Sequence, residues 1–354
     1  MNRGYKFRIY PSAEQKTMFA KMFGCVRFVY NRILSDKLEK KKSVTPAQYK
    51  NEFKWLREVD SLALCNAQVN LKRAFENHRK NARHFGKPRF KSKKTKQSYS
   101  TNNQKVSVRI EFGKIKLPKV GWIKLKAHRQ IMGTIKTVTI TKTSSDKYYV
   151  SIITEYENQV LKMIPQNFVG LDYSMRELFV SSEGEVAKYP KFYRWSEKKL
   201  ARTQRWFSRK DKDSKNQEKF RKRLSRIHER IASRRKDFLH KQSKSLVTKF
   251  DCISVEDLNM SGMSQALNFG KSVHDNGWGM FTRMLKYKCE QYGKTFVNIN
   301  PYEPSSQKCH CCGYKNLTMK DLSIRQWICP NCSSKHDRDV NAAINIREAG
   351  RKLI

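Results

Sequence analysis

Two different spacings of apolar residues divide the first half of the chain. The opening stretch GYKFRIYP alternates apolar with polar positions, which predicts a half-buried strand that ends at Pro11. From Ser12, a candidate N-cap, to about residue 85 the apolar residues recur at helical spacing, as in LCNAQVNLKRAFENH. Alternating runs return over residues 106–156, as in VSVRIEF and YYVSIITEY. We therefore expect a small β-barrel or sandwich that the opening strand completes, with the helices as an insertion.

The second half of the chain mixes apolar strands with a long basic helical segment. The run NFVGLDYS predicts a strand that ends at Asp172, and LFVSS predicts a second strand in a hairpin with it. Residues 196–249 are helical and basic with an interruption at KDKDSKNQ, which predicts a helical hairpin. This hairpin could contact a duplex backbone or be purely structural, and the pattern favours neither. FDCISVEDLNM predicts a third strand ending at Glu256 and Asp257, before an amphipathic helix, another strand and a cysteine cluster.

The charge balance indicates a polyanionic partner. Among 354 residues there are 75 Lys and Arg against 31 Asp and Glu, a formal net charge of +44. Because the basic residues are interleaved with aromatics rather than gathered on one amphipathic helix, nucleic acid is favoured over a membrane surface. An apolar content of 38% is enough for real cores, and the length favours two or three domains.

The basic stretch FGKPRFKSKKTKQ, residues 85–97, is a candidate contact for nucleic acid. It is rich in turn-forming residues and places aromatic rings among cations, which suits gripping phosphates while a ring stacks on a base. A plain solvated loop is the alternative, because charge runs are often only that. The candidate residues are Lys87, Arg89, Phe90, Lys91, Lys93 and Lys94.

Targeting signals are missing from the sequence pattern. No run of about 18 apolar residues is present, and the start MNRGYKFRIYP has no hydrophobic core of a signal peptide. We therefore expect a cytoplasmic or nuclear protein with no membrane partner. The nine cysteines are an odd number in a basic chain, which indicates metal ligands and free thiols rather than a disulfide framework.

Two CxxC pairs, with sixteen residues between them, form the strongest metal signal in the chain. Four thiolates on two tight turns satisfy tetrahedral zinc at roughly 2.3 Å per bond, and the spacing fits a zinc ribbon. His310 and Cys311 lie inside the first pair, and we expect them to be bystanders because adjacent residues cannot easily both reach one centre. Four protein ligands leave no open position, so this zinc is expected to be structural. The ligands are Cys309, Cys312, Cys329 and Cys332.

Three carboxylates are candidates for the chemistry. Asp172 and Glu256 end apolar strands, and Asp339 begins the helical run DVNAAINI, so the three can converge at one end of a sheet. Oxygen ligands suit Mg²⁺ or Mn²⁺, and two such ions about 3.5 to 4 Å apart could activate water and stabilise the leaving oxygen of a phosphodiester. Asp337 could be a helix cap, a further ligand or a solvated acid. Arg338 could contact the scissile phosphate or brace the acids.

The motifs GLDYS, SVEDLNM, PSSQKCHCCG, CPNC and DRDVNAAINI, in this order, closely resemble the TnpB proteins of insertion-sequence transposons, relatives of compact type V CRISPR effectors. RIYPSAEQ and GCVRFVYN extend the resemblance over nearly the whole chain. It implies a nuclease in which Asp172, Glu256 and Asp339 bind the catalytic metals. Many relatives have glycine where this chain has Ser174, a departure that questions the backbone geometry beside the first acid.

The same resemblance implies an α+β multidomain fold. It comprises a RuvC-like (RNase H fold) α/β nuclease domain with an inserted zinc ribbon, and an N-terminal wedge β-barrel that carries a helical recognition lobe. The implied ranges are 1–11 and 98–165 for the barrel, 12–97 for the lobe, 166–302 and 333–354 for the nuclease domain with its hairpin at 196–249, and 303–332 for the ribbon.

The function that the resemblance implies is RNA-guided cleavage of DNA. The expected partners are a guide RNA from the transposon end and a double-stranded target beside a short adjacent motif, with the protein monomeric in the ribonucleoprotein. The expected cofactors are one structural zinc and two catalytic Mg²⁺ or Mn²⁺ ions. The implied setting is the prokaryotic cytoplasm, at the nucleoid when the protein acts on DNA. The alternatives are a guided repressor that does not cut, which the three acids disfavour, and a transposase that itself joins transposon ends.

Overall fold

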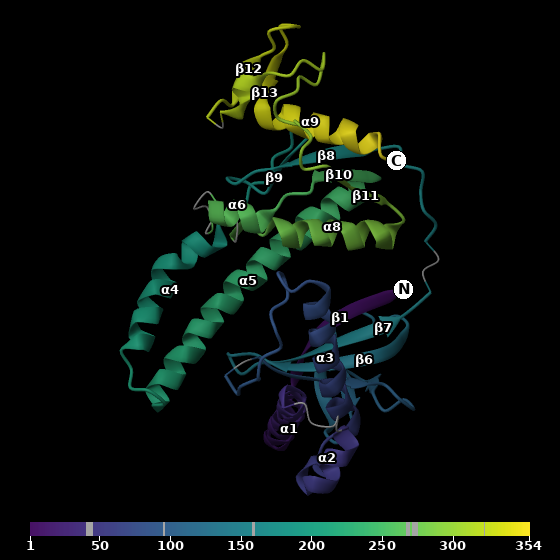
Figure 1. Ribbon diagram of the computed structural model, residues 1–354, viewed down its shortest axis with the longest axis vertical. Coiled ribbons are helices and arrows are strands. Elements are labelled where there is room, and N and C mark those ends of the chain that lie inside the picture. Colours follow the sequence, from purple (N-terminus) through teal and green to yellow (C-terminus); the bar gives the residue numbers. More distant parts are fainter. Residues whose placement is uncertain (40–44, 95, 158–159, 267–269, 271–274, 322) are drawn as a thin grey trace. The chain divides into compact units, whose positions relative to one another are not determined.

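The computed structural model describes residues 1–39, 45–94, 96–157, 160–266, 270, 275–321 and 323–354 (Figure 1). The chain divides into two units, Met1–Asn158 and Gln159–Ile354, each with its own hydrophobic core. Within the described ranges, none of the helices has the length and apolar composition that spanning a bilayer requires.

The first unit is built on one antiparallel sheet of seven strands in the order β2-β6-β7-β1-β5-β4-β3. The opening strand pairs with β7 on one side and β5 on the other, so it completes this sheet although the helical block separates them in sequence. In the part of the unit that the structure describes, β2 and β3 pair with one neighbour each, so the seven strands form an open sheet where a small barrel or sandwich was expected. The strands are β1 (Asn2–Tyr10), β2 (Gln97–Asn102), β3 (Arg109–Glu111), β4 (Lys114–Leu117), β5 (Gly121–Lys126), β6 (Thr134–Lys142) and β7 (Tyr148–Glu155).

The helices of the first unit lie between β1 and β2 in sequence and share one core with the sheet. Ser12 caps the first of them, as predicted, through a reciprocal pair of bonds: its Oγ accepts from the Gln15 amide at 3.2 Å, and the Gln15 Oε1 accepts from the Ser12 amide at 3.0 Å. The elements are α1 (Ala13–Leu38), α2 (Pro46–Glu52), the 3₁₀ turn η1 (Lys54–Glu58) and α3 (Ser61–Lys80).

The second unit is built on a four-stranded sheet in the order β11-β10-β8-β9. Strands β8, β10 and β11 are parallel, and β9 runs antiparallel to β8, as expected for the predicted hairpin. The bounds are β8 (Phe168–Tyr173), β9 (Phe179–Ser181), β10 (Cys252–Glu256) and β11 (Thr295–Ile299). The parallel strands are apolar because helices cover both faces of the sheet.

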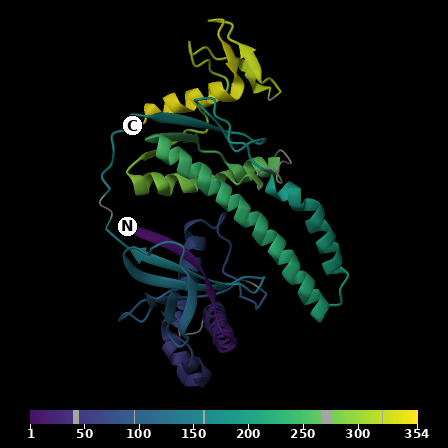
Figure 2. The same cartoon turned by 180° about the vertical axis from the view of Figure 1, so that it is seen from behind.

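Helix α9 (Arg338–Arg351) covers one face of this sheet, and α5 (Lys215–Lys249) and α8 (Trp278–Tyr292) pack on the other (Figures 1 and 2). Glycine permits the close approach of α9: a Cβ at Gly170 of β8 would overlap the carbonyl oxygen of Ala343, and one at Gly350 would overlap the Ser254 side chain. Small residues on both the helix and the strand therefore allow α9 to pack closely on β8 and β10.

A basic helical hairpin precedes β10 in the chain. Helices α4 (Phe192–Ser208) and α5 pack against each other over the predicted range, and the interruption KDKDSKNQ contains the turn between them. Ile227 and Ile231 of α5 are buried, while most of the cations on both helices are exposed. A short helix, α6 (Met260–Ala266), follows β10.

The cysteine cluster folds as a separate ribbon between β11 and α9. Strands β12 (Gln326–Ile328) and β13 (Lys335–Asp337) form an antiparallel pair, and η2 (Leu317–Lys320) places Met319 in a small core with Trp327. Strand β13 lies beyond residue 332, so the hairpin of the ribbon continues to Asp337, directly before the first residue of α9.

Candidate active site

The carboxyl ends of two parallel strands bring the first two acids together. Leu171 of β8 pairs with Val255 of β10, so Asp172 and Glu256 are the next residues on neighbouring strands. In open α/β sheets this edge is where ligands bind. Asp339 reaches the same place from the first turn of α9, which lies across β8 and β10. All three side chains are half-buried.

Asp172 carries the largest electrostatic cost among the three acids. Burial raises the pKa of Asp172 well above its ordinary value, and the nearby charges of Glu256 and Asp339 raise it further. The pKa of Glu256 is also raised by burial, with an opposing effect from a hydrogen bond that Ser305 donates to it. A bound divalent cation would relieve this repulsion, and the all-oxygen donor set suits Mg²⁺ or Mn²⁺. The donor chemistry of these residues therefore suits the metals expected from the sequence.

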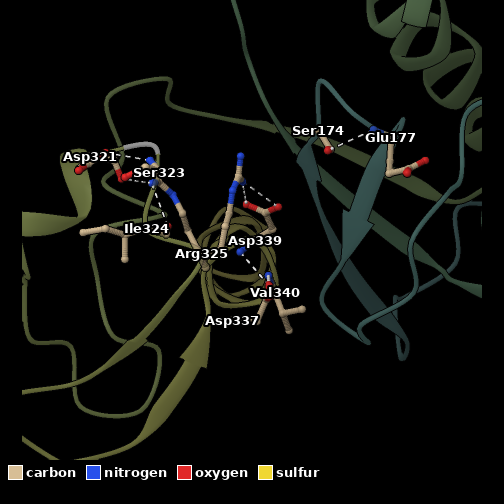
Figure 3. A network of polar contacts seen from close by, with 10 residues as sticks. Ser174, Glu177, Asp321, Ser323, Ile324, Arg325, Asp337, Asp339 and Val340 are labelled. Carbon is tan, nitrogen blue, oxygen red and sulfur yellow. Dashed lines mark hydrogen bonds and ion pairs between the residues drawn. The ribbon is translucent and has the colours of Figure 1, made fainter. Parts of the chain in front are cut away.

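Arg325 of the ribbon supplies a positive charge at this site. Its Nη1 lies 3.2 Å from Oδ1 and 3.3 Å from Oδ2 of Asp339, and Figure 3 shows the guanidinium facing that carboxylate. The Arg325 side chain is 50% exposed, so its guanidinium can move away from Asp339 when that carboxylate binds a metal ion. The ion pair thus joins the ribbon to one of the three acids.

Asp337 is a helix cap. Its Oδ1 accepts hydrogen bonds from the amides of Asp339 and Val340, each at 3.0 Å, which satisfies two of the free N–H groups at the start of α9 (Figure 3). Of the three roles open to this residue from its sequence, the structure shows the cap.

Arg338 points into the ribbon rather than toward a bound strand. The side chain is buried, and Nη1 donates to the carbonyl oxygens of Asp321 at 2.5 Å and Ile324 at 3.4 Å. Contact with a scissile phosphate is therefore excluded in this arrangement. Its charge still lowers the pKa of Asp172, so Arg338 braces the loop beside Arg325 and partly offsets the acids.

Ser174 does not disturb the backbone beside Asp172. It is not among the residues with positive φ, so this position does not need glycine. Its hydroxyl accepts from the Glu177 amide at 3.3 Å, and its carbonyl accepts from the Asn276 side chain at 3.0 Å. The departure from the family pattern has a structural use in the turn between β8 and β9.

The four predicted zinc ligands converge, with all four sulfurs within 4.8 Å of one another. The Cys309 and Cys332 sulfurs are 3.7 Å apart, and those of Cys312 and Cys329 are 3.6 Å apart. A tetrahedron with metal–sulfur bonds of roughly 2.3 Å has edges of roughly 3.8 Å, so the cluster fits one zinc ion.

The two turns of the ribbon have the same backbone. Gly313 and Ser333, each one residue after a CxxC pair, have φ values of 77° and 57°, and their amides donate to the carbonyls of Cys309 and Cys329 at 2.9 Å. A hydrogen bond from the Asn331 side chain lowers the pKa of Cys312 to about 6, which favours the thiolate that zinc requires.

A buried histidine lies beside the cysteine cluster. The Nε2 of His336 is 3.1 Å from the Cys309 sulfur, and its ring packs on Trp327 with a centroid distance of 4.7 Å. Cys309, Cys311 and His336 make a second group whose donor atoms lie within 4.8 Å of one another. Cys311 itself is exposed, and its sulfur lies 3.4 Å from Nε2 of His310; that both residues are bystanders to the four-sulfur cluster stays a prediction.

Two asparagines on α9 attach the ribbon to the helix that carries Asp339. The Asn341 side chain donates to the Lys308 carbonyl at 2.8 Å and accepts from the His310 amide at 3.0 Å. Asn345, one turn later, donates to the carbonyls of Ser305 at 2.7 Å and Lys308 at 2.6 Å. The ribbon, the helix and the acid site are therefore one hydrogen-bonded assembly within the second unit.

Sequence reasoning missed Arg325, Ser305 and the two asparagines. A signal existed for the pair: Asn341 and Asn345 are four residues apart, so they share one face of the helix beside small alanines. Arg325 and Ser305 carried no such signal, because each reaches the acids only through the fold of the ribbon.

In the first unit, the candidate basic stretch contacts α1 near both of its halves, and Arg27 of the helix donates to the Gln97 side chain at 3.1 Å. The Asn31 side chain exchanges hydrogen bonds of 2.8 and 2.9 Å with the backbone of Lys91, whose Nζ lies 3.7 Å from the Tyr30 ring centroid. Burial lowers the pKa of Lys91. Lys87, Arg89, Phe90, Lys93 and Lys94 are exposed, and their binding to nucleic acid stays a prediction.

Family models match three successive parts of the chain. Residues 1–43 match "Helix-turn-helix domain", 151–267 match "Probable transposase" and 278–346 match "Cas12f1-like, TNB domain". The last range contains both CxxC pairs and Asp339. The described part of residues 1–43 is β1 followed by the single long helix α1.

Two curated relatives match almost the whole chain. A Streptomyces pristinaespiralis protein named "Putative RNA-guided DNA endonuclease" is 33% identical over 99% of this chain and 90% of its own length. "Putative RNA-guided DNA endonuclease InsQ" of Escherichia coli K12 is 31% identical over 99% of this chain and 93% of its own length. The chain belongs to the TnpB family. "TnpB-like protein L770" of Acanthamoeba polyphaga mimivirus is a more distant relative, 27% identical over 65% of this chain and 46% of its own length.

The fold of this TnpB protein is similar to that of a solved Cas12f1 structure. A structure titled "Cryo-EM structure of the Cas12f1-sgRNA-target DNA complex" matches with a TM-score of 0.57, 13% identity and 98% coverage of both chains. At this identity the likeness supports an α+β fold of the same kind and carries no site residue across.

Proposed function

We propose that this chain is an RNA-guided DNA endonuclease of a transposon, which cuts DNA complementary to a bound guide RNA beside a short adjacent motif. The observation that carries the proposal is the convergence of Asp172, Glu256 and Asp339 at one edge of the sheet in a member of the TnpB family. The place of action that we infer is the cytoplasm of a prokaryote.

The proposed catalytic groups are the three acids in a RuvC-like nuclease domain. They would hold two Mg²⁺ or Mn²⁺ ions, which when bound supply an activated water and stabilise the leaving oxygen of the phosphodiester. Ser305 holds one oxygen of Glu256 and so orients this carboxylate. Arg325 is half-exposed at the site and can exchange Asp339 for a phosphate oxygen of the bound strand.

The proposed role of the ribbon is structural. One zinc ion on the four cysteines would close the two turns, and the bonds from Arg338, Asn341 and Asn345 would transmit that order to the start of α9. The cutting and the zinc are thus assigned to separate sites that share one helix.

The net charge of +44 supports the proposed nucleic-acid partners. If base pairing supplies sequence specificity, the protein needs a charged surface for the heteroduplex and a small reader for the adjacent motif. The α4–α5 hairpin offers such a surface, where Arg202 and Arg223 flank the Trp206 ring at 5.3 and 5.6 Å from its centroid. Its exposed cations are expected to contact backbone phosphates.

The test is cleavage of plasmid DNA by the ribonucleoprotein purified with its own RNA. The expected result is Mg²⁺-dependent cutting of a plasmid that matches the guide and none of a mismatched plasmid, with no cutting by Asp172→Ala. Equal cutting by wild type and Asp172→Ala would overturn the site. Guided binding without nicking in Mg²⁺ or Mn²⁺ would favour the repressor, and joined products from transposon-end DNA would favour the transposase.

A further inference from the structure

A two-residue turn in the first unit presents an aromatic ring to solvent. Glu111 of β3 pairs with Lys114 of β4, so Phe112 and Gly113 form the whole connection of this hairpin. Both have positive φ, 46° and 69°, as a type I′ turn requires. The Phe112 side chain is 100% exposed.

Phenylalanine is a poor choice for the folding of this turn. Type I′ turns favour Asn-Gly or Gly-Gly, because a side chain with a Cβ is strained at positive φ and asparagine tolerates it best. A fully exposed ring also gains nothing from the core, which takes Ile115 of β4 and Ile123 of β5 instead. Phe112 is therefore unfavourable for its backbone conformation and for the exposure of its ring to water. A contact of the ring with another molecule explains the presence of phenylalanine here better than folding does.

Strained positions gather around this hairpin. Eight non-glycine residues of the described ranges have positive φ, and four of them lie in the stretch 105–119. Val106 is one of these, although its branched side chain makes such a φ an outlier. The four are Lys105, Val106, Phe112 and Lys119.

The surface around the ring is cationic. Along β3, β4 and β5 the buried positions alternate with exposed ones, and the exposed charged side chains comprise five cations and one acid. Lys116 also lies 5.9 Å from the centroid of the Trp122 ring on the next strand. The charged residues are Arg109, Glu111, Lys114, Lys116, Lys124 and Lys126.

We propose that Phe112 stacks on an unpaired base of the guide RNA, while the lysines beside it contact the adjoining phosphates. An exposed ring among cations is the arrangement that binds single-stranded nucleic acid. An apolar pocket on another protein, or on a second copy of this chain, would gain nothing from the five cations. The choice of RNA rests on the proposed function: the RNA is bound before any target and offers unpaired bases outside its guide segment, whereas the DNA exposes an unpaired strand only after the guide has displaced it.

The test measures RNA affinity of the full chain, separately from cutting. Phe112→Asn removes the ring and creates the favoured Asn-Gly turn, so the hairpin should fold at least as well as in wild type. We expect its thermal midpoint to be unchanged or higher and its affinity for the co-purifying RNA to fall about tenfold. Phe112→Tyr keeps a ring and should bind like wild type. Leu38→Asn, at a 61% exposed apolar position on α1, is the matched control and should also bind like wild type.

Photocrosslinking identifies the partner of the ring. With 4-thiouridine in the RNA and 4-thiothymidine in the target, the peptide 109–116 should crosslink to RNA, and Phe112→Asn should lose that crosslink. Equal RNA binding by Phe112→Asn and wild type, or crosslinks of this peptide to DNA alone, would overturn the inference and leave the proposed nuclease intact. A wild-type chain that binds no RNA would overturn both.

Discussion

The two donor clusters of the second unit are assembled in different ways. The four sulfurs come from two turns close in sequence, which repeat one backbone conformation at Gly313 and Ser333. The three carboxylates come from β8, β10 and α9, and only the pairing of two strands and the packing of a helix brings them together. One cluster is a local structure, and the other is a product of the whole domain.

The clusters also differ in what they leave open. Four thiolates complete a tetrahedral coordination sphere, so a metal held there has no position for a substrate. Burial and the charges of Glu256 and Asp339 raise the pKa of Asp172, and Asp339 pairs with Arg325, so a bound cation would relieve repulsion at this site. The difference supports placing the proposed chemistry at the incompletely neutralised acids and the proposed scaffold at the four cysteines.

The largest expected effect is the difference in cleavage rate between a substitution at Glu256 and one at its neighbour Asp257. Glu256→Gln removes a metal-binding charge at the strand end and should lower the single-turnover cleavage rate by about 10³-fold or more. Asp257→Asn changes an exposed acid one residue later and should stay within about twofold of wild type, since surface changes are usually small. The measurement is plasmid cleavage at saturating RNA. Similar losses in both variants would remove the distinction between a ligand and a nearby acid.

The next effect concerns the closed cluster. Cys329→Ser should release the zinc, lower the thermal midpoint and reduce cutting together, because the bound metal orders the ribbon that holds α9. Cys311→Ser, at the exposed bystander, should keep one zinc per chain and full activity. Metal analysis of the purified ribonucleoproteins checks both, and a zinc-loaded, active Cys329→Ser protein would contradict the assignment.

An intermediate effect is expected at the ion pair that joins the clusters. Arg325→Ala should lower the cleavage rate about 10- to 100-fold at saturating Mg²⁺, through loss of a charge beside the phosphate. It should also lower the Mg²⁺ concentration for half-maximal cutting, because Asp339 no longer has a competing partner. Arg325→Lys should recover part of the rate. A variant unchanged in both rate and Mg²⁺ dependence would show that the pair has no role in cutting.

The smallest effect tests the mechanical link. Asn345→Ala removes two hydrogen bonds to the backbone of the ribbon and should destabilise the protein by about 1–3 kcal/mol, with several-fold slower cutting and zinc retained. Asn298→Ala, at an exposed position of β11, is the matched control and should change stability by about 0.5 kcal/mol or less. Thermal unfolding of both proteins decides whether the ribbon depends on α9.

The sequence predicted what depends on local spacing or on repeated pattern. The alternation at Tyr5, Phe7 and Ile9 predicted β1, and the CxxC pairs predicted the sulfur cluster. An open rather than closed sheet was not predictable, because alternation shows which face of a strand is buried but not whether the edges of its sheet meet.

The acid site was predictable only in part. Strand ends and the family motifs identified Asp172, Glu256 and Asp339, and the structure places them together. Ser305 and Arg325 come from irregular segments of the ribbon, where no period relates a residue to its neighbours in space. The same limit applied to Arg338, whose side chain points to the ribbon for a reason that only the fold reveals.

Cutting is assigned to the acid site and structural support to the ribbon. This division is tested most directly at Asp337 and Asp339, which are two residues apart at the start of α9. The measurement is plasmid cleavage by Asp339→Asn and Asp337→Ser ribonucleoproteins matched for RNA and zinc content. Asp339→Asn should lose cutting by about 10³-fold or more while keeping its RNA and one zinc, because it removes a metal-binding charge. Asp337→Ser should cut like wild type, because serine also caps a helix. Wild-type cutting by Asp339→Asn, or loss of cutting by a zinc-loaded Asp337→Ser protein, would contradict the account.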